Sequence, residues 1–219
     1  MRETVAQDGR RARGDASRRI VLHSATDLAS VEGLDGLSIG RLAEASGSSK
    51  SSIATLFQSK EGLQLATVAA AREIFTARIV EPAREQPRGV RRVAALLHNS
   101  LAYSKDRVFT GGCFFAATAA DVDSKSGPVR DAVRAALIDW YGYVEAQLRH
   151  AVDAGEIEAD PEVLAFELVA LNEEANSRSL LMDDARPYAL AAAAMRARLL
   201  AAGAPAASLA PLASPEPPP

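Results

Sequence analysis

Apolar residues recur along most of the chain at the three- and four-residue spacing of amphipathic helices. This spacing predicts helices over roughly residues 16–31, 60–79, 89–104 and 187–202. It also predicts a short helix after Cys113, a long one from Pro128 to a stop at Gly155, and another that opens at Asp160-Pro161. Runs of β-branched residues with a period of two are missing, so the sequence predicts an all-α fold.

The stretch from Leu37 to Leu63 combines two short helices with a turn between them. Ser38 and Ser49 are suitable N-caps, and the turn between the helices contains Gly47. On the second helix one face carries Ile53, Leu56 and Phe57, and the other face carries Lys50, Ser51, Ala54 and Thr55. Two helices joined in this way form a helix-turn-helix, whose second helix enters the major groove of DNA.

This stretch resembles the DNA-binding domain of the tetracycline-repressor (TetR) family of transcriptional regulators. The matching residues keep the family's spacing over about 45 positions and are Gly33, Ser38, Leu42-Ala43, Gly47, Ser49-Lys50, Phe57, Ser59-Lys60-Glu61 and Leu63. The resemblance implies an all-α chain with an N-terminal three-helix DNA-binding domain and a larger helical domain for ligand binding and dimerisation.

The resemblance also implies which side chains touch DNA. The positions that face base edges are Lys50, Ser51, Ser52 and Thr55, and the positions that hold phosphates are Ser38, Ser49 and Lys60. Lysine can donate to guanine, and serine or threonine to several base edges. Arg41, on the first helix of the motif, is a weaker candidate for a phosphate contact.

Two positions depart from the family pattern. Ala54 and Leu56 stand where many members carry aromatic residues, and the usual tyrosine at the first position helps to hold a phosphate. The departure keeps an alternative open, in which the chain is a helical ligand-binding or adaptor protein whose helix-turn-helix no longer binds DNA.

Charge is distributed unevenly along the chain, whose formal net charge is −3. Residues 1–63 carry nine Lys and Arg against eight Asp and Glu, so the acidic excess lies in the remainder. Five arginines gather near the N-terminus, namely Arg10, Arg11, Arg13, Arg18 and Arg19. They are either a solvated charge run or a basic arm that reaches the DNA backbone or minor groove.

These patterns divide the chain into four parts. We expect a disordered basic arm over residues 1–14 and a helix-turn-helix domain over 15–63. A helical effector-binding and dimerisation domain follows over 64–202, and a disordered Pro/Ala-rich tail over 203–219.

The middle of the chain supplies the apolar walls and the few polar groups that a small-molecule pocket needs. The candidate apolar and aromatic walls are Leu97, Leu101, Phe114, Phe115, Trp140, Tyr143 and Val144, and the candidate polar groups are His98, Tyr103, Asn172 and Asn176. Stripes of this kind also form plain hydrophobic core, and that reading stays open.

The last two helices are expected to pair with a second copy. The resemblance implies a four-helix bundle across a two-fold axis, and alanines in the last helix allow close packing. A dimer also follows from DNA recognition, since one short helix reads only a few base pairs.

Enzymatic chemistry has no support in the sequence. His23, His98 and His150 are far apart, and no nucleophile, metal or phosphate-loop spacing occurs. We therefore expect no cofactor. A single cysteine, no apolar signal segment and no run of about 20 apolar residues predict a cytoplasmic protein without a membrane partner. The leading hypothesis is a dimeric regulator that represses at a palindromic operator and is released by a small-molecule effector.

Overall fold

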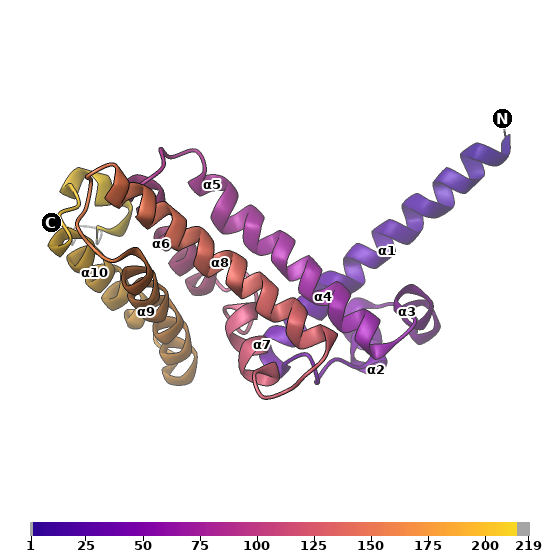
Figure 1. Cartoon of the computed structure of the whole chain (residues 1–219). Helices are drawn as coiled ribbons and strands as arrows, with labels where there is room; N and C mark the ends of the chain where they lie inside the picture. Colours follow the sequence, from indigo (N-terminus) through magenta and orange to yellow (C-terminus); the bar gives the residue numbers. More distant parts are fainter. Residues whose placement is uncertain (1, 214–219) are drawn as a thin grey trace, which may run out of the picture. The chain divides into compact units, whose positions relative to one another are not determined.

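The computed structural model describes the backbone of residues 2–213 and the side chains of residues 14–213. Within that part of the chain every regular element is a helix, which confirms the all-α prediction (Figure 1). The elements are α1 (Arg2–Glu32), α2 (Ile39–Ser46), α3 (Lys50–Phe57), α4 (Lys60–Phe75), η1 (Thr76–Val80), α5 (Glu81–Ala83), α6 (Val90–Lys105), α7 (Phe114–Val122), α8 (Pro128–Asp153), α9 (Pro161–Met182), α10 (Arg186–Ala201) and η2 (Ala206–Leu212). None of the described helices is both long enough and apolar enough to span a lipid bilayer.

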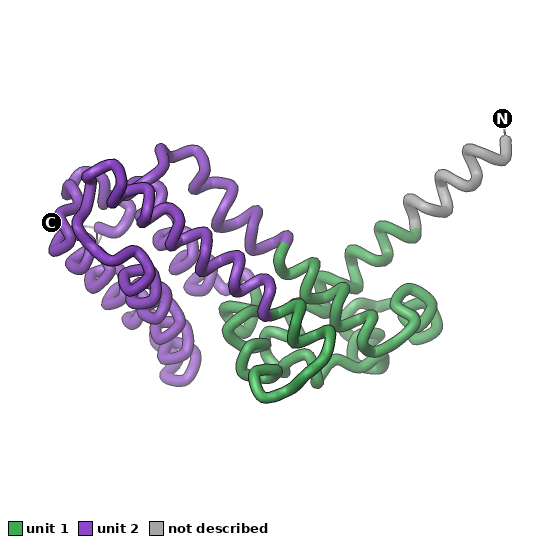
Figure 2. The backbone as a smooth tube through the Cα atoms, in the orientation of Figure 1, with its two compact units in different colours: residues 1–72, 109–133 green, residues 73–108, 134–219 purple. Residues whose placement is uncertain are grey.

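The chain forms two compact units (Figure 2). Unit 1 contains residues 1–72 and 109–133, and unit 2 contains residues 73–108 and 134–219. The predicted boundary at residue 63 therefore differs from the structure, because α4 continues to Arg72 within unit 1 and the segment 109–133 returns to it.

Helices α1, α2 and α3 enclose the core of unit 1. Gly33 ends α1 with a φ of 73°, and its N–H donates to the carbonyl oxygen of Ala29 at 3.0 Å. The buried side chains of this core include Leu34, Leu37, Leu42, Ile53 and Phe57. Val21 is buried in this core, whereas its neighbour Ile20 is 56% exposed.

Polar contacts fasten segment 109–133 to α1. The carboxylate of Asp27 accepts hydrogen bonds from the backbone N–H of Thr110 at 2.7 Å and from its hydroxyl at 3.0 Å. The N–H of Gly111 donates to the Ser30 hydroxyl at 3.0 Å. A Cβ at Gly111 would lie only 1.9 Å from the Ser30 carbonyl oxygen, so this approach requires glycine.

The core of unit 2 joins α6, the C-terminal half of α8, α9 and α10. Its buried members include Leu97, Val144, Leu148 and Leu164. The cap that begins α9 is the predicted one, since the Asp160 carboxylate accepts from the N–H groups of residues 162 and 163.

The predicted disordered tail is wrong for residues 203–213. Gly203 adopts a φ of 100°, and the chain then turns into η2, whose Leu209 and Leu212 are buried in the core of unit 2. The Pro/Ala-rich composition concealed these two leucines, which are spaced for one apolar face. Residues 214–219, and the side chains of residues 1–13 in the predicted basic arm, lie outside the described part.

Candidate nucleic-acid interface

Local capping sets the geometry of the two helices. The Ser38 hydroxyl accepts from the N–H of Arg41 at 3.3 Å and caps α2. Gly47 ends α2 with a φ of 65°, and the Ser49 hydroxyl accepts from the N–H of Ser52 at 3.1 Å to begin α3. The caps lie where the sequence predicts them.

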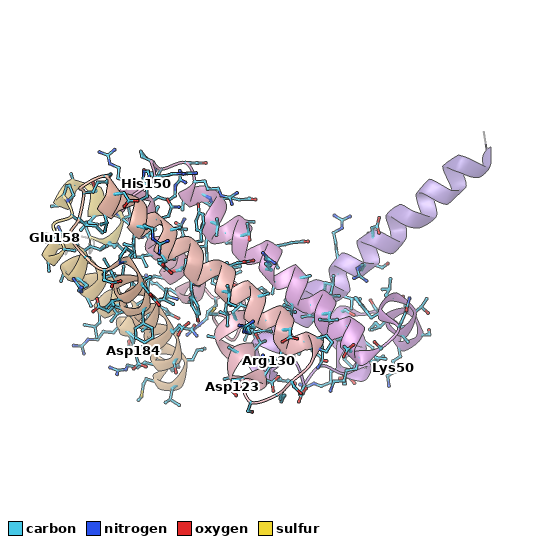
Figure 3. The ribbon with its side chains drawn as sticks, viewed as in Figure 1. Lys50, Asp123, Arg130, His150, Glu158 and Asp184 are labelled. Carbon is cyan, nitrogen blue, oxygen red and sulfur yellow. The ribbon has the colours of Figure 1, made fainter. Side chains whose placement is uncertain are left out.

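The orientation of α3 separates packing residues from polar ones. Ile53 and Phe57 are buried against the rest of unit 1. The predicted base-reading side chains are all exposed and share the remaining surface of the helix, namely Lys50, Ser51, Ser52 and Thr55. Figure 3 labels Lys50, the first residue of α3, which forms no ion pair or hydrogen bond with the described side chains.

Two of the exposed hydroxyls have partners within the helix. Thr55 Oγ1 donates to the Ser51 carbonyl oxygen at 2.9 Å, and the hydroxyls of Ser49 and Ser51 lie 3.1 Å apart. A hydroxyl that donates in this way keeps lone pairs for a base amino group, and either serine can rotate to donate to an acceptor.

The two predicted cationic phosphate contacts take part in unit 1 itself. Lys60 Nζ donates to the Asp35 carbonyl oxygen at 2.8 Å, although an ammonium keeps two further donors. The guanidinium of Arg41 pairs with the Glu32 carboxylate. Arg41 therefore contributes less free charge than an unpaired arginine would.

The loop before α2 is held by a polar cluster that the sequence did not reveal. Lys125 Nζ lies 2.8 Å from carboxylate oxygens of both Asp35 and Asp121. Its hydrogen bond lowers the pKa of Asp35, and the two carboxylates, Asp121 first, raise the pKa of Lys125. The buried Gln64 donates to the Leu34 carbonyl oxygen at 2.9 Å. These contacts fix the chain immediately before the helix-turn-helix.

Several predicted effector residues meet in unit 2. Leu97, Leu101 and Val144 are buried in its core. Tyr103 and Trp140 both pack edge-on against Phe75, with ring centroids 5.6 and 5.1 Å apart. The sequence reading missed Phe75, because its place at the end of α4 gave no sign of aromatic partners.

Two of the four predicted polar groups, Asn172 and Asn176, belong to small hydrogen-bond networks. Ser100 Oγ donates to Asn172 Oδ1 at 3.3 Å. The Tyr188 hydroxyl donates to Asn176 Oδ1 at 3.4 Å and accepts from Arg107 Nη1 at 3.2 Å. Arg107 was not predicted, and its position after α6, with a φ of 51°, offers no periodic signal.

The remaining predicted effector residues lie elsewhere. His98 is exposed in a surface groove of about 570 Å³ beside η2. The guanidinium carbon of Arg84 lies over the ring of Tyr143, 5.9 Å from the ring centroid. Phe114 and Phe115 belong to unit 1, where Phe114 packs against Phe109 at 6.1 Å. The structure therefore does not gather the predicted set within one unit.

A second groove of unit 2, of about 510 Å³, lies along α8 and α9. Its wall is mainly apolar and includes Tyr141, Val163 and Phe166, with three glutamates at its edge. None of the predicted effector residues lines it. Within residues 14–213 no cluster of three or more His, Cys, Asp or Glu side chains is arranged to hold a metal ion.

Comparison with known proteins agrees with this geometry. Residues 21–67 match the model of bacterial regulatory proteins of the tetR family, and residues 89–195 match the tetracyclin repressor-like C-terminal domain. The sequence matches none of the proteins with curated functions.

Solved structures share the fold. A TetR transcriptional regulator from Chloroflexus aurantiacus is 26% identical, with a TM-score of 0.76 over 84% of this chain and 94% of that one. AibR, solved with isovaleryl coenzyme A and operator DNA, is 19% identical, with a TM-score of 0.63 over 74% and 86%. A putative regulator from Saccharomonospora viridis, solved with choline, is 20% identical, with a TM-score of 0.66 over 76% and 86%.

The two family models account for both the helix-turn-helix and the larger helical part, and the structural neighbours named share the fold over 74–84% of this chain. The chain belongs to the TetR family of transcriptional regulators.

Proposed function

We propose that this protein is a ligand-responsive repressor that binds a palindromic operator as a homodimer through α3. The observation that carries the proposal is the exposed polar face of α3, where Lys50, Ser51, Ser52 and Thr55 project from a helix anchored by Ile53 and Phe57. Lysine suits guanine O6 and N7, and the hydroxyls suit several base edges.

The helix caps support phosphate binding beside this face. Ser38 and Ser49 stand at the N-termini of α2 and α3, where backbone N–H groups and the helix dipole favour an anion. Lys60 opens α4 and keeps donors beyond its bond to Asp35. In this proposal these three groups fix the register of the protein on DNA, and α3 reads the sequence.

The dimer is proposed to form through α9 and α10. Both helices leave large apolar side chains in solvent, including Phe166 at 77% exposure and Leu181 at 80%. Met182 and Leu190 extend the same kind of surface. Apolar exposure on this scale is typical of an interface, and the groove along α8 and α9 adjoins it at Phe166.

The effector is proposed to bind in unit 2 near Phe75, Tyr103 and Trp140, with Asn172 as a polar group. Aromatic walls with a few polar groups are typical of small-molecule sites. AibR with its coenzyme A thioester and the S. viridis protein with choline show that this fold accepts small ligands of different chemistry. The effector would favour a dimer whose two α3 helices no longer fit adjacent major grooves.

Selection from random duplex DNA tests the proposal. The purified dimer should enrich a palindrome whose half-sites lie about 10–10.5 base pairs apart, or a multiple of that spacing. The Lys50→Ala variant is the matched control, since this side chain is exposed and supports no described contact. If a folded, ligand-free dimer enriches no consensus, the chain is instead a helical ligand-binding or adaptor protein.

A further inference from the structure

Helix α1 contacts the C-terminal end of α3 through the side chain of Arg18. Arg18 Nη1 donates to the carbonyl oxygen of Leu56 at 3.3 Å. The Arg18 guanidinium carbon also lies 4.8 Å from the centroid of the Phe57 ring. Among residues 14–57 this is the only hydrogen bond that joins α1 to α3.

The end of α3 is a place where such a contact has a large effect. Leu56 belongs to the last turn, whose carbonyl groups have no N–H partner within the helix. Gln58 ends the helix with a φ of 62°, which is unfavourable for a residue with a side chain. A cation at this terminus satisfies one carbonyl and complements the negative end of the helix dipole.

Phe57 links this contact to the reading face. Its ring is buried, and it stands two residues after Thr55, on the same short helix as Lys50. Only Ile53 and Phe57 of α3 are buried, so a displacement of the Phe57 side chain would shift the eight-residue helix and its exposed face. The arginine stacked on the ring therefore restricts displacements of α3 that would move its base-reading side chains.

From these contacts we infer that Arg18 is a positioning residue for the recognition helix α3, and that it does not neutralise a phosphate. The inference rests on the proposed DNA-binding function. It separates Arg18 from its neighbour Arg19, which is exposed and donates to the Asp15 carbonyl oxygen at 3.4 Å within α1. The two adjacent arginines thus have different roles.

The test measures operator affinity for folded dimers of Arg18→Gln, Arg18→Lys and Arg19→Gln over a series of salt concentrations, on the palindrome that the wild type selects. A lost phosphate contact reduces the slope of log K against log salt by about 0.9. A lost positioning contact weakens binding and leaves the slope unchanged. We expect Arg18→Gln to bind about five- to tenfold more weakly with the wild-type slope.

Lysine at position 18 provides the sharper comparison. Lysine keeps the positive charge. It lacks the planar guanidinium, which can stack on an aromatic ring while its N–H groups donate hydrogen bonds in the plane of the group. Arg18→Lys is therefore expected to lose affinity nearly as Arg18→Gln does, and the loss is expected to be non-additive with Phe57→Leu in a double-mutant cycle. If lysine restores wild-type binding, or if Arg18→Gln lowers the salt slope, Arg18 is a phosphate contact and the inference is wrong.

A role of Arg18 in stability alone can also be distinguished from a positioning role. If Arg18 served only the stability of unit 1, its variants would melt at lower temperature but each folded dimer would bind with wild-type affinity, which overturns the inference. If the wild type itself selects no palindrome, the proposed function fails first. In that case hydrogen exchange of the α3 amide groups, compared between wild type and Arg18→Gln, still tests the inference. The exchange should be faster in Arg18→Gln than in Arg19→Gln, and equal exchange contradicts positioning.

Discussion

Asp27 and Thr110 are 83 positions apart in the chain, yet one carboxylate receives both polar hydrogens of the threonine, from its N–H at 2.7 Å and its hydroxyl at 3.0 Å. The pair ties segment 109–133 to α1 and makes that segment part of the unit that contains the helix-turn-helix.

Removal of this carboxylate should destabilise unit 1. Asp27→Ala removes both of these exposed hydrogen bonds, and we expect a loss of about 0.5–1.5 kcal/mol in the free energy of unfolding. Asp27→Asn is the matched control, because an amide can still accept from the N–H and donate to the hydroxyl. Urea unfolding followed by circular dichroism measures both, and equal stability of all three proteins would contradict the role given to this pair.

The C-terminal segment η2 should also contribute to the stability of unit 2. Leu209 is fully buried in the core of unit 2, so Leu209→Ala should cost about 2–5 kcal/mol. Ala210→Ser, at the exposed neighbouring position, should leave the free energy of unfolding within about 0.5 kcal/mol of wild type. A tolerated Leu209→Ala would mean that η2 does not complete this core in solution.

The ion pairs of Lys125 should make the stability of unit 1 depend on pH. The pKa of Asp35 is lowered, so its contribution to stability is present above the ordinary aspartate pKa and is lost as pH falls through the lowered value. The pKa of Lys125 is raised, so its contribution is present below the ordinary lysine pKa and is lost as pH rises through the raised value.

We therefore expect Lys125→Met to lower the melting temperature slightly near neutral pH. The difference from wild type should shrink in strong acid and again in strong alkali. Lys105→Met, at an exposed lysine of unit 2, is the control and should show no such dependence. A difference that stays constant across the whole pH range would show that the two carboxylates do not interact with Lys125 in solution.

Substitution of Phe166 should weaken the proposed dimer. Its side chain is exposed on α9, so Phe166→Glu should leave the fold of the chain intact and place a charge in the proposed interface. We expect the dimer dissociation constant to rise by about a hundredfold or more, as for a central aromatic anchor. Sedimentation at several concentrations measures the shift, with the exposed Asp153→Asn on α8 as control. A variant as dimeric as wild type would place the interface elsewhere.

Local signals explain what the sequence could predict. The caps and the turn were correctly placed from the local sequence. Their residues are Ser38, Gly47 and Ser49, which act on backbone groups within three residues. The same is true of the Asp160 cap at the start of α9. The family resemblance rested on these positions and is confirmed by the family models.

Contacts between distant residues explain what the sequence could not predict. Nothing near Thr110 indicates that its partner is Asp27, and the Pro/Ala-rich tail hides the burial of Leu209. Phe75 packs against Tyr103 and Trp140, which come from other helices, and its position in the sequence gave no sign of these partners. Arg18, placed by charge in a basic run, acts through Phe57 on a neighbouring helix.

Base reading by the exposed face of α3 is tested by comparing wild type with Lys50→Ala on the selected palindrome and on single-base variants of it. We expect the substitution to cost about 1–3 kcal/mol per half-site and to remove discrimination at one base pair. Equal affinity and unchanged base preference in the two folded dimers would contradict it.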